Sequence, residues 1–214
     1  MRTALPTLAA LAMLSTGCAA RSHVVETATA APARVHIQVV PVDATGATIA
    51  KAARHFLTNP RGGFRDDCSG FVEAVLHRAG ITHVVGSTRQ MWSISLADGA
   101  VHRTSDARVG DLAFFDNTYD RNGNGEADDA LTHVAVVIAV EADGTVVMAH
   151  DSSSRGPTTL RMNLHHRDEA GAGTQRLNDN LRWPDPKRPT LRVLTGQLWR
   201  GFATVRADAV AAVE

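Results

Sequence analysis

The sequence predicts an α+β fold in which a helix that carries a cysteine packs on an antiparallel sheet. The helix is predicted to start near residue 69, because apolar residues recur on one helical face from there and Gly80 closes the pattern. The sheet is predicted from a β-branched run at 131–140, which a turn at 141–145 joins to a second apolar run at 146–150.

Length and composition indicate one catalytic domain with appendages. The chain has 214 residues, of which 44% are hydrophobic, and this is enough to bury a single core. Its 22 basic and 22 acidic residues balance without a lysine- and arginine-rich run, which argues against a nucleic-acid partner. The two cysteines are Cys18 and Cys68, so no internal disulfide can form if Cys18 belongs to a processed leader.

Residues 1–18 have the features of an export signal. One positive charge precedes an apolar run that is shorter than the roughly 20 residues a membrane-spanning helix needs. The ending Leu14-Ser15-Thr16-Gly17-Cys18 resembles a bacterial lipoprotein signal, in which cleavage before the cysteine frees it to carry lipid. This resemblance implies a lipid anchor at Cys18 in the cell envelope, at the outer membrane or in the periplasm of a Gram-negative cell. Ordinary signal cleavage near Ala19 or Ala20 would instead give a secreted protein.

The other elements follow in chain order. Residues 19–42 are predicted to form a tether, rich in alanine, threonine, serine and proline at first, with a short strand at 35–40. The folded domain is predicted over 43–205 and a frayed tail over 206–214. Within the domain we expect a helix at 48–57, a loop leading into a short helix at 87–92, a turn and buried strand at 108–115, a long loop within 151–190, and closing strands at 191–194 and 198–202.

Cys68 stands at the start of the predicted helix, which suits a nucleophile. The positive end of the helix dipole and the unpaired amides of the first turn both favour thiolate over thiol. Asp67 is expected to cap the helix, which is a structural role. Position alone leaves a second interpretation open, in which Cys68 is a small core residue packed under the helix.

His133 and His150 supply partners for Cys68, since His133 begins one predicted strand and His150 ends its hairpin neighbour. A cysteine nucleophile needs a base, and that imidazole needs a polar group on its other nitrogen. We therefore assign Cys68 to attack a carbonyl carbon, His133 to move its proton and His150 to orient His133. Counted from the turn, the two histidines are not directly opposite, so a bulge or a different turn centre is required.

Four motifs occur in a fixed order: Asp67–Val72, Val109–Phe115, Thr132–Val137 and Ala149–Ser153. Together they resemble the NlpC-type cell-wall cysteine peptidases, whose relatives, the CHAP amidase-peptidases, share a papain-like layout. The resemblance covers about residues 45–205. It implies a papain-like fold with Cys68 as nucleophile, His133 as base and His150 as the third polar residue. It also implies that the substrate is the peptide portion of bacterial peptidoglycan, cut at an amide bond by an endopeptidase or amidase that requires no cofactor for catalysis.

A polar insertion at 116–129 has the pattern of a calcium loop. Oxygen-bearing side chains and a glycine occupy its first, third, fifth, sixth and ninth places. The candidate ligands are Asp120, Asn122, Asn124, Glu126 and Asp128. The twelfth place is Leu131 in place of the usual glutamate, for which Asp129 could substitute. Calcium would stiffen the entry to the strand that carries His133, and the alternative is a solvated, turn-rich loop.

Two other functions stay open at this level. One is a non-catalytic, cell-wall-binding lipoprotein on the same fold. The other is a zinc site formed by Cys68, His133 and His150, because a thiolate and two imidazoles are competent zinc ligands.

Overall fold

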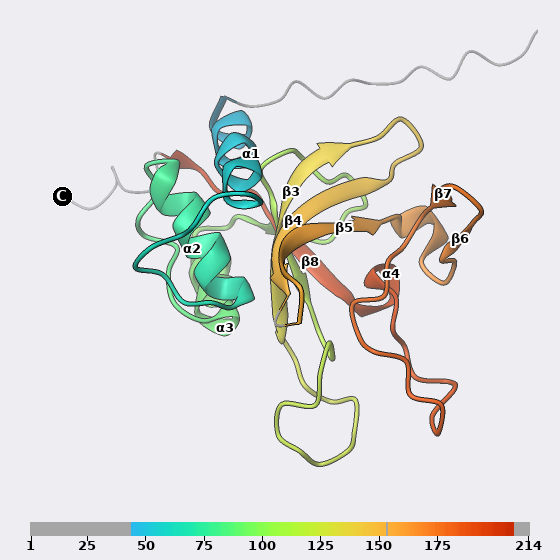
Figure 1. Cartoon of the computed structure of the whole chain (residues 1–214). Coiled ribbons are helices and arrows are strands. Elements are labelled where there is room, and N and C mark those ends of the chain that lie inside the picture. Colours follow the sequence, from blue (N-terminus) through green and yellow to red (C-terminus); the bar gives the residue numbers. More distant parts are fainter. Residues whose placement is uncertain (1–43, 153, 208–214) are drawn as a thin grey trace, which may run out of the picture. The chain divides into compact units, whose positions relative to one another are not determined.

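Figure 1 shows the computed structural model of the chain, in which residues 44–152 and 154–207 are described. These residues form helices packed on a six-stranded antiparallel sheet, which confirms the predicted α+β, papain-like fold class. The predictions for the signal at 1–18 with Cys18, the tether at 19–42 and most of the tail at 206–214 fall outside the described residues. Among the helices that are described, none has both the length and the apolar character that crossing a membrane requires.

The sheet contains six strands in the order β1-β8-β2-β3-β4-β5, and every neighbouring pair is antiparallel. The strands are β1 (Val101–His102), β2 (Leu112–Phe115), β3 (His133–Val140), β4 (Val146–Ser152), β5 (Gly156–Met162) and β8 (Trp199–Ala203). A separate ribbon pairs β6 (Gly171–Ala172) with β7 (Gln175–Arg176). The predicted hairpin is confirmed as β3 and β4, which lie inside the sheet.

Three helices lie together on one side of the sheet in Figure 1. They are α1 (Ala44–Phe56), α2 (Cys68–Arg78) and α3 (Thr88–Ala97). The short helix α4 (Thr195–Leu198) lies on the other side, and a 3₁₀ turn, η1 (Leu164–His166), follows β5.

The side chains of β3 alternate between two hydrophobic cores. Val134 and Val136 pack with the apolar residues of α1, α2 and α3, whereas Ala135 and Val137 pack with Leu160 of β5 and its neighbours. This alternation follows from the two-residue period of a strand. A strand buried on both faces explains why the sequence of β3 is apolar without interruption.

Two segments of the C-terminal half differ from the sequence analysis. The segment at 151–190, predicted to hold a long loop, also contains β5, where Leu160 and Met162 are buried on either side of Arg161. That strand escapes detection because Gly156 and Pro157 stand at its start and only its last residues alternate. The strand predicted at 191–194 is wrong, since only an isolated bridge forms there.

The outer side of β5 is occupied by the segment that follows the ribbon. The N–H of Arg161 donates to Oδ2 of Asp179 at 2.7 Å, and the carbonyl of Arg161 accepts from the N–H of Asp179 at 3.1 Å and from the hydroxyl of Thr195 at 2.7 Å. Pro157, near the start of the strand, has no N–H to offer. These bonds hold residues 176–183 beside β5, where they form one wall of a pocket described below.

Two glycines let α1 approach the sheet closely. A Cβ on Gly46 would lie 2.1 Å from the carbonyl oxygen of Val109, in the turn before β2. Gly110 has a φ of 93°, and a Cβ there would lie 2.3 Å from the Cα of Gly46. Backbone therefore packs on backbone at this point, and only glycine fits on either side.

We predict that Gly46→Ala destabilises the protein by about 1–3 kcal/mol, because the added methyl group meets main-chain atoms that cannot move aside. The free energy of unfolding in urea measures the effect. Gly62→Ala is the matched control, since a Cβ at Gly62 meets nothing within 4 Å. Equal stability of the two variants would contradict the proposed close contact.

Candidate active site

The N-terminus of α2 holds Cys68 in a fixed position. Oδ1 of Asp67 accepts hydrogen bonds from the N–H of Gly70 at 2.6 Å and from the hydroxyl of Ser69 at 2.8 Å, which confirms the predicted cap. A Cβ on Gly70 would lie 2.2 Å from the carbonyl oxygen of Arg65. The chain before α2 therefore folds tightly over its first turn.

The thiol of Cys68 is partly buried, and burial raises its pKa above the ordinary value. The N–H of Val134, the hydroxyl of Thr88 and the N–H of Ser69 act in the opposite direction by favouring the thiolate. The Thr88 Oγ1 atom lies 3.8 Å from the sulfur. The carboxylate of Asp67 disfavours a second negative charge nearby and so raises the pKa of Cys68. Because the net shift of the pKa is upward, the predicted preference for thiolate at this helix start is wrong for the free protein.

The sulfur of Cys68 meets the sheet where β3 begins. Val134, whose N–H faces the sulfur, directly follows His133, the first residue of β3. The structure thus brings the predicted nucleophile to the peptide groups next to the predicted base. Thr88, at the first turn of α3, is a neighbour of the sulfur that the sequence analysis does not identify.

His133 and His150 form a direct hydrogen bond, with 2.9 Å between Nε2 of His133 and Nδ1 of His150. Their ring centroids are 4.9 Å apart and the rings meet edge to face. The side chains are buried, with exposed fractions of 9% for His133 and 3% for His150. The sequence-predicted pair is therefore together in space.

A bulge in the hairpin allows this contact, as the sequence analysis requires. Val136 pairs with Ala149, and the register shifts between Val137 and Ala139. If the pairing of Val136 with Ala149 continues regularly toward the start of β3, His150 lies opposite residue 135. His133 then lies two residues away on the same face, which is the diagonal position from which two large side chains can touch.

Burial lowers the pKa of both imidazoles. The pKa of His133 falls to about 4, although the carboxylates of Asp151 and Asp67 oppose the shift. The pKa of His150 falls to about 2, and the neighbouring His133 lowers it further. Both rings are therefore neutral at neutral pH, so one of them donates the shared hydrogen and the other accepts it.

A buried ion pair lies next to this cluster. The guanidinium of Arg61 donates to Oδ2 of Asp151 at 2.5 Å, and the two side chains are only 7% and 5% exposed. Arg61 also lies over the ring of Phe71 in α2. Asp151 favours the protonated form of His133. Neither Arg61 nor Asp151 is among the predicted site residues, although Asp151 directly follows His150 in the sequence.

The turn into β3 is held by several polar contacts. Leu131 has a φ of 55°, unusual for a residue other than glycine, and its N–H donates to Oδ1 of Asp116 at 2.7 Å. The N–H and the hydroxyl of Thr118 both donate to Oγ1 of Thr132 at 2.9 Å. These contacts fix the chain immediately before His133.

The loop at 116–129 gives calcium no support. The carboxylate of Asp120 accepts hydrogen bonds from the N–H groups of Gly123 and Gly125, both at 2.7 Å. The amide groups of Asn122 and Asn124 donate to the two oxygens of Asp128, and Oδ1 of Asn124 accepts from the N–H of Glu126. Within the described residues, no three His, Cys, Asp or Glu side chains are grouped to hold a metal ion. The calcium site therefore stays a prediction.

The zinc alternative for Cys68, His133 and His150 does not fit the geometry. The nitrogens Nε2 of His133 and Nδ1 of His150 bond to each other, so these two atoms do not converge on a common point. Among the described residues, no group of three or more His, Cys, Asp or Glu side chains that could hold a metal ion includes Cys68.

This arrangement, a helix-borne cysteine beside a sheet with two buried histidines, defines a papain-like α+β domain. Residues 58–152 match the family model of the CHAP domain, which belongs to the papain-like amidase and peptidase superfamily. Of the two related families that the motifs resemble, CHAP is thus the one matched. The match spans Cys68, His133 and His150. No curated protein matches this chain.

We predict that Asp151→Ala destabilises the protein by about 3–5 kcal/mol, because it leaves the guanidinium of Arg61 buried without a counter-ion. Chemical unfolding measures the loss. Asp66→Ala is the matched control: it removes the other carboxylate bound by Arg61, but its side chain is 98% exposed, so we expect a loss below about 1 kcal/mol. Similar losses in both variants would contradict a special role for the buried pair.

We also predict that the protein loses stability on acidification from about pH 7 to about pH 5. The folded-state pKa values of His133 and His150, about 4 and about 2, lie below the unfolded value of about 6.5. In this interval the unfolded chain binds more protons than the folded one, so stability falls as pH falls.

The measurement is the free energy of unfolding as a function of pH. The double variant His133→Asn/His150→Gln should show a shallower slope, since it lacks both imidazoles. A slope identical to that of the unaltered protein would assign the acid sensitivity to other groups.

Proposed function

We propose that this protein is a cysteine hydrolase that cuts an amide bond in the peptide portion of bacterial peptidoglycan. The observation that carries the proposal is the cluster at the start of β3, where the sulfur of Cys68 lies beside the N–H of Val134 and His133 is bonded to His150. The cluster falls within the residues that match the CHAP domain, and that domain implies cysteine-dependent amidase or peptidase activity on peptidoglycan.

His150 would set the protonation of His133. If Nδ1 of His150 accepts the shared hydrogen, Nε2 of His133 carries it and Nδ1 of His133 keeps a free lone pair. Nδ1 is therefore the nitrogen that can take a proton from Cys68, while His150 positions the ring.

In the proposed reaction, His133 accepts the thiol proton as the sulfur of Cys68 attacks the carbonyl carbon. The carbonyl oxygen gains the negative charge, and amides at the start of α2 are candidate donors to it. His133 then gives its proton to the leaving amine as the carbon–nitrogen bond breaks, which leaves a thioester on Cys68. Water that loses a proton to His133 hydrolyses the thioester, and the thiol and a carboxyl product are formed.

The electrostatics favour proton transfer during attack over a resting ion pair. The pKa of Cys68 is raised and that of His133 is lowered, so both groups are uncharged in the free protein. Once His133 is protonated, the carboxylate of Asp151 stabilises the positive charge. Asp151 acts here as a positioning and electrostatic residue, since its own contact is with Arg61.

We infer that the protein acts outside the cytoplasm. The sequence at 1–18 supports export, and hydrolases with a CHAP domain that act on the cell wall work outside the cytoplasm. Cys18, at the end of the predicted signal, is the proposed site of lipid attachment.

We predict that Cys68→Ala lowers the cleavage of purified peptidoglycan by at least about 10³-fold, because no other group can form the thioester. Mass spectrometry of the released muropeptides measures the activity and identifies the bond that is cut. Thiol alkylation in a Cys18→Ser background, where Cys68 is the remaining cysteine, should abolish turnover as well.

Circular dichroism and peptidoglycan sedimentation serve as controls for folding and for wall binding. Unchanged turnover after complete alkylation would refute Cys68 as the nucleophile. Wall binding without any cleavage by the unaltered protein would favour the non-catalytic, wall-binding alternative.

A further inference from the structure

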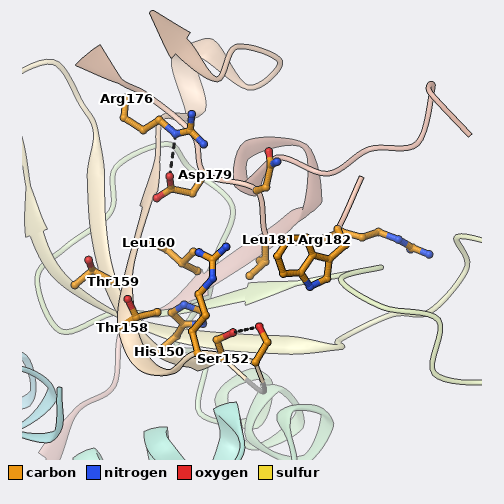
Figure 2. A pocket seen from close by; sticks show the side chains of 13 residues that line it. His150, Ser152, Thr158, Thr159, Leu160, Arg176, Asp179, Leu181 and Arg182 are labelled. Carbon is orange, nitrogen blue, oxygen red and sulfur yellow. Dashed lines mark hydrogen bonds and ion pairs between the residues drawn. The ribbon is translucent and has the colours of Figure 1, made fainter. Parts of the chain in front are cut away.

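A pocket lies beside His150, between strands β4 and β5 and the segment 176–183 (Figure 2). Its volume is about 230 Å³. We call it the His150 pocket, and its charged and aromatic lining residues, besides His150, are Arg155, Arg176, Asp179, Arg182 and Trp183. The reaction proposed above uses none of these five side chains.

His150 brings an unsatisfied polar atom to this pocket. Its Nδ1 bonds to His133, whereas its Nε2 is buried and has no hydrogen-bond partner. A buried polar atom without a partner is destabilising and rare in native structures. If His133 is to act as the base, His150 accepts at Nδ1 and therefore carries its own hydrogen on Nε2. The unsatisfied atom is then a donor that requires an acceptor.

No carboxylate of the pocket can supply that acceptor. Asp179 is the acidic residue of the lining, and Figure 2 shows it paired with Arg176, at the opposite end of the pocket from His150. Its Oδ1 accepts from Nε of Arg176 at 3.0 Å and its Oδ2 from the N–H of Arg161 at 2.7 Å. Both oxygens are engaged, and within the described residues no atom of the lining accepts a hydrogen bond from Nε2 of His150.

The charges of the lining favour an anion. The lining contains three guanidinium groups, those of Arg155, Arg176 and Arg182, and one carboxylate. Arg176 is neutralised by Asp179, and Arg182 donates to the carbonyl oxygen of Asn117. Arg155 forms no ion pair among the described residues, and its guanidinium lies 5.5 Å from the ring centre of Trp183. It is therefore free to bind a negative group.

We propose that the His150 pocket binds a small oxyanion, of which a carboxylate is the simplest, held between the Nε2–H of His150 and the guanidinium of Arg155. Charge-assisted hydrogen bonds of this kind are the strong ones in proteins. The volume of the pocket admits a carboxylate group with a short chain. The carboxylate can belong to a free anion or to a peptidoglycan peptide, since such peptides carry free carboxylates.

Occupancy of the pocket would reach Cys68 through the two histidines, a step that rests on the proposed function. A negative charge at Nε2 of His150 makes Nδ1 a better acceptor and favours the protonated form of His133. The groups that face His150 are His133 from β3, with Asp179 and Arg155 from the segments around the pocket. Of these, only Arg155 combines a full charge with the lack of a charged partner.

The test is a titration of the full chain, labelled with ¹⁵N-histidine, with sodium acetate that replaces sodium chloride at constant ionic strength. We expect the Nε2 resonance of His150, assigned with His150→Gln, to shift and saturate. Arg155→Gln should weaken acetate binding by about tenfold, as loss of one charge-assisted contact predicts. Arg103→Gln, at an exposed arginine outside the pocket, should leave binding unchanged.

A resonance that does not saturate, or equal affinities in the protein and in Arg155→Gln, would overturn the proposal. This readout needs no turnover, so it stands or falls separately from the hydrolase assignment. If cleavage is absent while acetate still binds, the pocket is supported and the proposed function is not.

The coupling to Cys68 and the source of the carboxylate are tested next. Acetate should raise the rate of iodoacetamide alkylation of Cys68 several-fold in the Cys18→Ser background, and an unchanged rate would overturn the coupling. A cell-wall stem peptide with free carboxylates that displaces acetate, while its fully amidated form does not, assigns the site to the substrate. Acetate binding that neither peptide affects assigns the site to free anions.

Discussion

The hydrogen bond between His133 and His150 is the contact around which the site is organised. Both rings are enclosed by protein, so neither can carry a charge at neutral pH without a large penalty. A neutral imidazole has one donor and one acceptor, and a shared hydrogen therefore fixes the roles of all four ring nitrogens. In the proposed function, Cys68, His133, His150 and the His150 pocket thus form one chain of groups.

The surrounding architecture serves to hold this chain of groups in place. The bulge in β3 sets the diagonal relation of the two rings, and the left-handed turn at Leu131 delivers His133 to the start of the strand. Cys68 arrives from a different layer, at the capped first turn of α2. The ion pair of Arg61 and Asp151 joins the segment before α2 to β4. Helix layer and sheet are therefore connected by an ion pair next to His133.

The parts of the site that depend on local pattern could be predicted from the sequence. The amphipathic face of α2, the cap at Asp67 and the β3–β4 hairpin are properties of neighbouring residues, and they placed Cys68, His133 and His150 in the right elements. The pKa of Cys68 could not be predicted in this way. A helix start favours thiolate, but burial by distant parts of the chain outweighs it, and no local pattern records that burial.

Residues that act through long-range contacts were missed for the same reason. Arg61 and Asp151 are 90 positions apart and look like ordinary surface charges in the sequence. β5 was missed because its pairing with β4, and not its own alternation, makes it a strand. The calcium site stays a prediction, since in the described loop the candidate ligands bond to one another and to the loop's own amides.

The outer edge of β5 is partly blocked against pairing with a strand of another molecule. An outermost strand normally exposes a ladder of unpaired amides and carbonyls, which invites strands of other molecules to add to it. Here Asp179 and Thr195 occupy the main-chain groups of Arg161, and Pro157 offers no amide at all. At these two positions β5 has no free main-chain group, or no amide, to offer to a strand of a second copy of the chain.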